Sequence, residues 1–120
     1  MATETNTSER AIRIGWASRD ITPERPNLLR GQFYARVSEG LRDPITVTAL
    51  ALESPDGEAQ AILVSCDLVG VPAWVPGEVR AALADRVEDF DPAMLIMHAT
   101  HTHTAPTLDE GVYPEQDASV

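Results

Sequence analysis

Lysine is absent from this chain of 120 residues, and its nine basic residues are all arginine. Aspartate and glutamate together number 19, which leaves a formal net charge of −10. Such a surplus of negative charge argues against nucleic acid or an anionic membrane surface as an electrostatic partner. A lipid-like substrate stays possible, because a single molecule can bind in an apolar cleft without any basic surface.

Cysteine and long apolar runs are scarce as well. The single cysteine, Cys66, excludes an intrachain disulfide, and its place in an apolar strand pattern predicts a buried thiol rather than a nucleophile. No stretch approaches the ~18 consecutive apolar residues that a transmembrane segment needs. No signal peptide is visible in the polar first residues, so a soluble, cytoplasmic product is the default expectation.

Aromatic residues make up only 5% of the chain, so we expect a core of Val, Leu, Ile and Ala. The hydrophobic pattern predicts strands at 11–16, 45–53, 60–69 and 93–99, a turn at 55–58, and a helix from Pro76 to Phe90. The two middle strands form a hairpin, and the second of them is apolar on both faces and therefore central in its sheet. Between the first two strands, residues 23–44 form a long irregular loop, which in compact domains is usually functional or disordered.

These elements predict an α/β (α+β) fold, in which a mixed β-sheet with packed helices forms part of a domain. At least one apolar face of the sheet is left without a covering layer. Small chains bury proportionally little surface, so we expect the isolated chain to be marginally stable or to self-associate.

All three histidines of the chain lie within residues 98–103. Side chains two apart on a strand point to the same face, so His101 and His103 can present two imidazoles from one sheet edge toward a common point. Neutral imidazole is the commonest protein metal ligand, and the pair therefore favours a metal site over a structural role. His98 is out of step with the pair, and we interpret it as structural.

Several unrelated hydrolase classes carry His-x-His at a strand end, and the neighbouring residues discriminate among them. A metallo-β-lactamase-type site needs Asp-His where Ala105 and Pro106 stand. Amidohydrolase barrels carry the pair on their first strand, whereas three strands and a helix precede it here. A cupin needs a glutamate soon after the pair on the same strand, and none is suitably placed.

Three motifs agree with a further class of hydrolase. They are Ile14 to Pro23, with a glycine followed by Asp-Ile-Thr; Gly40 to Pro44; and Ala99 to Pro106, which is similar to Thr-His-Thr-His-Ser-Gly-Pro. Over roughly residues 12–108 the sequence thereby resembles the N-terminal catalytic domain of the neutral/alkaline non-lysosomal ceramidases. Three positions depart from the family pattern: Thr104-Ala105 replaces Ser-Gly, and Arg42 stands where family members often have histidine.

The resemblance implies a zinc-dependent amide hydrolase that cleaves ceramide, an N-acyl sphingoid base, into fatty acid and sphingoid base. His101 would be a zinc ligand, and His103 would lie over the substrate carbonyl and stabilise the developing oxyanion. The family's other zinc ligands, a His, a Glu and a Tyr, come from farther downstream, and its members are often secreted. We therefore expect an incomplete N-terminal portion of such an enzyme, with Zn²⁺ binding that is weak or absent in this portion.

The domain organisation follows from the extent of the resemblance. We expect residues 1–11 to be a disordered leader, 12–108 to be the N-terminal portion of a ceramidase-like catalytic domain, and 109–120 to be a truncated acidic tail. Two other hypotheses stay open. One is a catalytically silent fragment or degenerate homologue acting as a small α/β module, and the other is a hydrolase of another N-acyl amine.

Other polar and aromatic residues have simpler interpretations. Asp67, at the end of a buried strand, is expected to be a hydrogen-bonded structural carboxylate. Asp20, in Asp-x-Thr before a proline, predicts a self-capping turn. Trp16 and Trp74 are expected to pack in the core or on the surface. Ser65 has no base near it in the sequence, so a nucleophilic serine is not supported.

Overall fold

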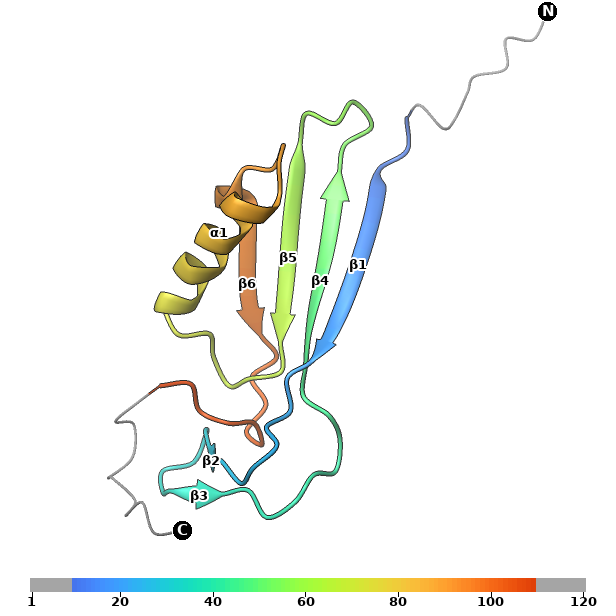
Figure 1. The fold of residues 1–120 in the computed structure, drawn as a ribbon. Coiled ribbons are helices and arrows are strands. Elements are labelled where there is room, and N and C mark those ends of the chain that lie inside the picture. The colour runs from blue at the N-terminus through green and yellow to red at the C-terminus, as the bar shows by residue number, and fades with distance from the viewer. Residues whose placement is uncertain (1–9, 110–120) are drawn as a thin grey trace, which may run out of the picture.

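The computed structural model describes residues 10–109, and these form a four-stranded sheet, one α-helix and a small two-stranded sheet (Figure 1). The predicted α+β fold with a mixed sheet is confirmed. The predicted leader and acidic tail lie almost wholly outside the described residues. In chain order the elements are β1 (Arg13–Asp20), β2 (Leu28–Leu29), β3 (Arg36–Val37), β4 (Thr46–Glu53), β5 (Gln60–Cys66), α1 (Trp74–Arg86), the 3₁₀ turn η2 (Pro92–Met94) and β6 (Leu95–Ala99).

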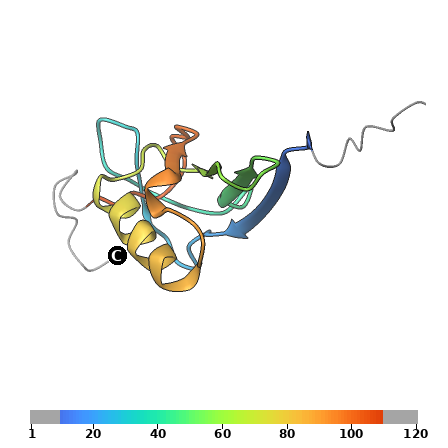
Figure 2. The same cartoon turned by 90° about the horizontal axis from the view of Figure 1, so that it is seen from above.

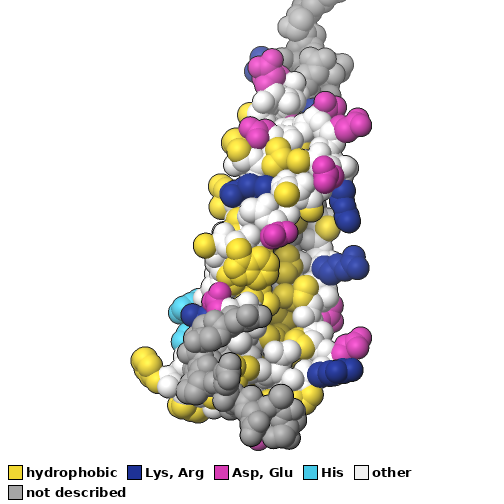
Figure 3. All heavy atoms as spheres, turned by 60° about the vertical axis from the view of Figure 1, so that its left-hand side comes forward, with side chains coloured by type: hydrophobic (Ala, Val, Ile, Leu, Met, Phe, Trp, Pro, Cys, Tyr) yellow, Lys and Arg dark blue, Asp and Glu magenta, His cyan; other side chains and the backbone are white. Residues whose placement is uncertain are grey.

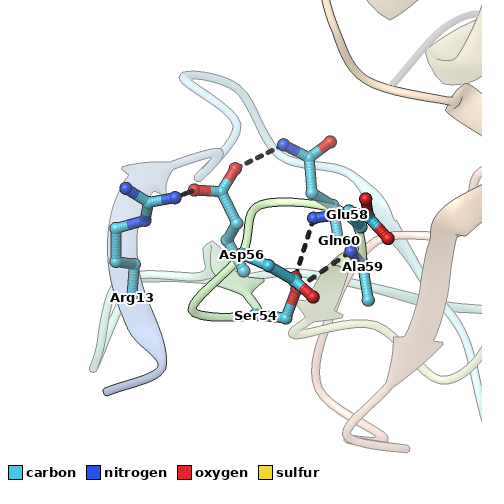
Figure 4. Close-up of polar contacts among 7 residues, drawn as sticks. Arg13, Ser54, Asp56, Glu58, Ala59 and Gln60 are labelled. Carbon is cyan, nitrogen blue, oxygen red and sulfur yellow. Dashed lines mark hydrogen bonds and ion pairs between the residues drawn. The ribbon is translucent and has the colours of Figure 1, made fainter. Parts of the chain in front are cut away.

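The β4–β5 hairpin is closed by hydrogen bonds between residues that are close in the sequence. The strands pair antiparallel from Val47 opposite Cys66 to Glu53 opposite Gln60, as predicted. In the turn (Figure 4), Asp56 Oδ1 accepts hydrogen bonds from the Ser54 hydroxyl at 2.5 Å and the Glu58 N–H at 3.0 Å. The Ser54 hydroxyl, and after it the Glu58 N–H, hold the pKa of Asp56 below its ordinary value.

The main sheet has the strand order β1-β4-β5-β6, with β5 central as predicted. The β5–β6 pair is parallel, so the chain must cross from one end of the sheet to the other, and α1 makes that crossing. Val79 and Leu83 of α1 pack against a core that includes Val64, Cys66 and Leu95. Figure 2 shows the helix on one side of the sheet, with β1 extending away from it. Only the β5–β6 half of that face is therefore well covered.

The opposite face of the sheet is open. The strand register places Trp16, Leu50, Leu63 and Ile96 in one row across it, because each residue lies opposite the next. Trp16 is 82% exposed and Ile96 is 55% exposed. Trp16 therefore lies on the surface, and no second layer covers this face in the described part of the chain. Trp74 is also largely exposed, at 58%. Self-association through this face stays a prediction.

Several predicted boundaries differ from the structure, and the strand predicted at 60–69 ends at Cys66. The first strand runs on to Asp20, since β4 pairs with it along its whole length. The helix begins at Trp74 and ends at Arg86, so Pro76 lies at its third position rather than its first. That place still tolerates proline, because the N–H groups of the first helical turn have no partner in the helix. The last strand begins at Leu95, after a 3₁₀ turn opened by Asp91.

The predicted irregular loop at 23–44 contains a pairing that no pattern reveals. Leu28 lies opposite Val37 and Leu29 opposite Arg36, which makes a two-stranded antiparallel sheet. Each strand has two residues, too few for alternation to be recognised in the sequence. This β2–β3 hairpin, residues 28–37, lies below the carboxyl end of β5 and β6 (Figure 1). Within residues 10–109 there is no helix with the length and apolarity needed to cross a membrane.

Candidate functional site

The two candidate histidines follow β6 rather than lying in it. β6 ends at Ala99, and the chain then continues beside the residues that follow β5. The Thr100 N–H donates to the Cys66 carbonyl at 2.9 Å, and the His101 N–H donates to the Leu68 carbonyl at 3.0 Å. These two bonds prolong the parallel pairing beyond both strands. They place His101 at the sheet edge formed by the carboxyl ends of β5 and β6, which is where open α/β sheets bind ligands.

His101 has an unusual backbone and a defined tautomer. Its φ of 65° is in the left-handed region, which is uncommon for residues other than glycine and is found preferentially at functional sites. Its Nδ1 lies 2.6 Å from the Val69 carbonyl oxygen. A carbonyl oxygen can only accept, so Nδ1 must donate, and in the neutral ring Nε2 then keeps its lone pair. Metal-binding histidines typically have this arrangement, with the second ring nitrogen donating to a carbonyl or carboxylate.

His101 and His103 lie together, but not for the predicted reason. Their ring centroids are 4.9 Å apart and the ring planes meet at 85°, an edge-to-face contact. The prediction that strand alternation aligns them is wrong, because the strand ends at Ala99 and His101 has left-handed backbone. Both side chains are exposed, and histidine reaches the surface at the left-hand edge of the view, in the lower half of the molecule (Figure 3). The pair can therefore be reached from solvent.

Asp67 holds together the segments beneath the pair. Its Oδ2 accepts from the Thr46 N–H and from the Thr46 hydroxyl, both at 3.0 Å, and its Oδ1 accepts from the Thr100 hydroxyl at 3.3 Å. One carboxylate thus joins the start of β4, the end of β5 and the residue before His101. The prediction of a hydrogen-bonded structural carboxylate is confirmed.

The β2–β3 hairpin forms the other wall of the site, and the sequence reasoning missed it. The Arg30 N–H donates to the Ala105 carbonyl at 3.0 Å, and the Thr107 N–H donates to the Leu28 carbonyl at 2.9 Å. Arg36 Nη2 donates to the carbonyl of His103. In the sequence, the feature that could have indicated this wall is the glycine in the long loop, Gly31. Its φ in the structure is 113°.

The other residues considered in the sequence lie outside the histidine pair. Asp20 accepts a hydrogen bond from the Thr22 N–H at 2.8 Å, which confirms the predicted turn, and contacts with Thr22 lower its pKa. Cys66 is buried, as predicted, and burial, with a smaller effect of the Asp67 charge, raises its pKa. Arg42 is exposed and lies 4.0 Å from the carboxylate of its neighbour Asp43.

The strand pairing brings Ser65 beside a histidine that is distant from it in the sequence. It lies opposite His98 in the parallel β5–β6 register, so both residues face the open side of the sheet. Among residues 10–109, however, no hydrogen bond joins the two side chains. His98 is exposed and separated from the pair by the end of β6. A serine nucleophile therefore has no support from the geometry either.

The donor set suits one ligand of a metal ion but not a complete site. No group of three or more His, Cys, Asp or Glu side chains that could hold a metal ion occurs in the described residues. Catalytic zinc takes three protein ligands and a water. His101 can provide one ligand, because within residues 10–109 its ring is hydrogen-bonded through Nδ1 and not through Nε2.

The fold and the histidine pair together describe an α+β fragment with two adjacent imidazoles at one edge of its main sheet. Among solved structures, the crystal structure of neutral ceramidase from Pseudomonas aeruginosa is similar, with a TM-score of 0.71 and 24% sequence identity. The match covers 82% of this chain and 16% of that protein, so this chain spans about a sixth of its length. At this identity the similarity establishes the fold, and the prediction of a ceramidase-like fold is confirmed. No protein-family model matches the chain, and no curated protein does so.

The left-handed backbone at His101 can be tested by comparing two variants. His101→Gly and His101→Ala both remove the imidazole and its bond to Val69, so their difference in stability reports on the backbone alone. We expect the glycine variant to be more stable by about 1 kcal/mol, because a left-handed φ strains alanine. Urea denaturation followed by circular dichroism measures the difference.

His98 provides the matched control, because it lies in regular strand backbone in β6. There the order should reverse, with glycine about 0.5–1 kcal/mol less stable than alanine. The same order at both positions would contradict a left-handed His101.

Proposed function

We propose that this chain contributes the histidine pair of a ceramidase-like zinc amide hydrolase. His101 is the zinc ligand of the pair, and His103 donates to the oxyanion that develops when an N-acyl amine, such as ceramide, is cleaved into fatty acid and amine. The observation that carries the proposal is the 2.6 Å distance between His101 Nδ1 and the Val69 carbonyl oxygen, which leaves Nε2 as the acceptor of the neutral ring.

The proposed role of His101 is to bind the zinc ion through a ring whose orientation is fixed. Zinc, when bound, lowers the pKa of a coordinated water to about 7 and so supplies a nucleophile at neutral pH. The Val69 carbonyl keeps the proton on Nδ1 and limits rotation of the ring. Partners of this kind are commonly worth 10–100-fold in metal affinity.

The proposed role of His103 is to stabilise charge. A donor placed at the developing oxyanion is commonly worth about 3 kcal/mol of the barrier. The two rings meet edge to face with their centroids 4.9 Å apart, so a carbonyl oxygen bound beside His101 would also lie near His103. His103 therefore acts without being a metal ligand itself.

A competing hypothesis is a catalytically silent fragment, and it is favoured by the absence of a three-ligand group among residues 10–109. The two hypotheses make the same prediction for turnover by this chain, because one histidine cannot provide the three protein ligands of a catalytic site. They differ in whether zinc binds selectively at His101. Metal binding, rather than activity, is therefore the discriminating measurement.

We expect a zinc titration followed by ¹H–¹³C NMR to shift the ring resonances of His101 while those of His98 stay in place. In the His101→Ala variant the zinc-dependent shift of the neighbouring His103 ring should be lost, because Nε2 of His101 is removed. The matched control is His98→Ala, which should keep the response at His101 unchanged. No shift of any histidine resonance, or an equal loss of response in both variants, would contradict zinc binding at His101 and favour the silent fragment.

A further inference from the structure

The ring of His103 is held in a different way from that of His101. Within residues 10–109 no hydrogen bond reaches the His103 ring, whose contact with the His101 ring is one of packing. The backbone of His103 is held by Arg36, which donates to its carbonyl. An exposed ring on a fixed backbone can still occupy several rotamers, so some further contact is needed to keep it beside His101.

Gly31 of the β2–β3 hairpin makes that contact. A Cβ placed ideally at Gly31 would lie 2.6 Å from both Cγ and Nδ1 of His103, and 2.9 Å from its Cβ. Real Cβ atoms essentially never approach so closely, so the imidazole lies in the space that a side chain at position 31 would fill. The φ of 113° at Gly31 is itself unfavourable for any residue with a side chain.

The hairpin cannot easily move to relieve such a clash. Before Gly31 it is bonded to the chain beyond His103, through Arg30 to Ala105 and through Leu28 to Thr107, and after Gly31 the side chain of Arg36 donates to the His103 carbonyl. The side chain of Arg30 also pairs with the Asp109 carboxylate at 2.5 Å. A side chain at position 31 would therefore displace the His103 ring rather than the hairpin.

We propose that Gly31 is a positioning residue for His103. Because glycine has no side chain, the imidazole of His103 can lie directly against the backbone of residue 31 and stay packed beside His101. The catalytic meaning of this contact rests on the proposed function, since only there does His103 donate to an oxyanion. The contact itself involves neither metal nor substrate. Its test can therefore fail or succeed independently of the zinc titration.

The experiment compares Gly31→Ala with Gly57→Ala by ¹H–¹³C NMR of the three histidine rings at one pH. Gly57 is a matched control because it also has positive φ, 75°, while the nearest atom to a Cβ there is Arg13 Nη2 at 3.4 Å. Both variants thus strain the backbone, and only one meets a histidine. We expect Gly31→Ala to shift the ring resonances of His103 and leave those of His98 in place, and Gly57→Ala to shift neither.

The wild-type chain gives a second measurement that needs no variant. The hydrogen of Gly31 that takes the Cβ direction points at His103, so a nuclear Overhauser effect between the Gly31 Hα and the His103 protons is expected. Its absence would overturn the proposal even if Gly31→Ala failed to fold. Unchanged His103 resonances in a folded Gly31→Ala protein would overturn it as well.

Discussion

Replacing Leu95 with alanine is expected to destabilise the fold by about 2–5 kcal/mol, the cost of a cavity in a packed core. Leu95 is 1% exposed and is the largest fully buried side chain among the described residues. It lies in β6 within the cluster that α1 covers. Small domains have about 5–15 kcal/mol of stability in total, so this one change should raise the unfolded population by orders of magnitude.

The lone cysteine provides the measurement. Cys66 is buried in the same cluster, and burial raises its pKa, so its thiol should react with a disulfide reagent only when the fold opens. The labelling rate in Leu95→Ala should therefore rise with the opening equilibrium. Urea denaturation checks the same free energy independently.

Ile96→Ala is the matched control, since Ile96 is the next residue of the same strand and faces the open side of the sheet. With 55% of its surface already exposed, its truncation should change the free energy of unfolding by less than about 1 kcal/mol. A loss equal to that of Leu95→Ala would contradict an uncovered face. If that loss depended on protein concentration, it would indicate that self-association covers the face.

Replacing Asp67 with alanine is expected to cost about 2–3 kcal/mol, because hydrogen bonds to a charged acceptor are worth about 1.5–3 kcal/mol each and the Thr46 N–H would lose its partner. The side chain joins Thr46 to Thr100, the residue before His101. The variant should therefore also shift the His101 ring resonances. Urea denaturation and histidine NMR measure the two effects.

Two further variants separate the effect of the hydrogen bonds from that of the charge. Asp67→Asn keeps one carbonyl acceptor for Thr46 and should lose less stability than Asp67→Ala. Asp43→Ala removes an acidic side chain that is 87% exposed and should be nearly neutral. If Asp43→Ala were as costly as Asp67→Ala, the loss at position 67 could not be attributed to its hydrogen bonds.

The predictable part of the fold is the part built from local patterns. The β4–β5 hairpin follows from two β-branched strands and a Pro-Asp-Gly turn, and the order of β5, α1 and β6 follows from periodicity and proline. The β2–β3 hairpin could not be predicted, because its strands have two residues each and are stabilised by bonds to residues 105–107. Nothing local in residues 28–37 reports on such distant partners.

The strands of the main sheet, the helix and two histidines near a sheet edge could be predicted from the sequence, because alternation and helical spacing are properties of neighbouring residues. The arrangement of those histidines, by contrast, depends on contacts between distant segments. The Val69 carbonyl sets the tautomer of His101, the carbonyl of Leu68 anchors its left-handed backbone, and Gly31 provides the space for His103. These contacts join segments that are far apart in the chain, and so they exist only once the sheet has formed.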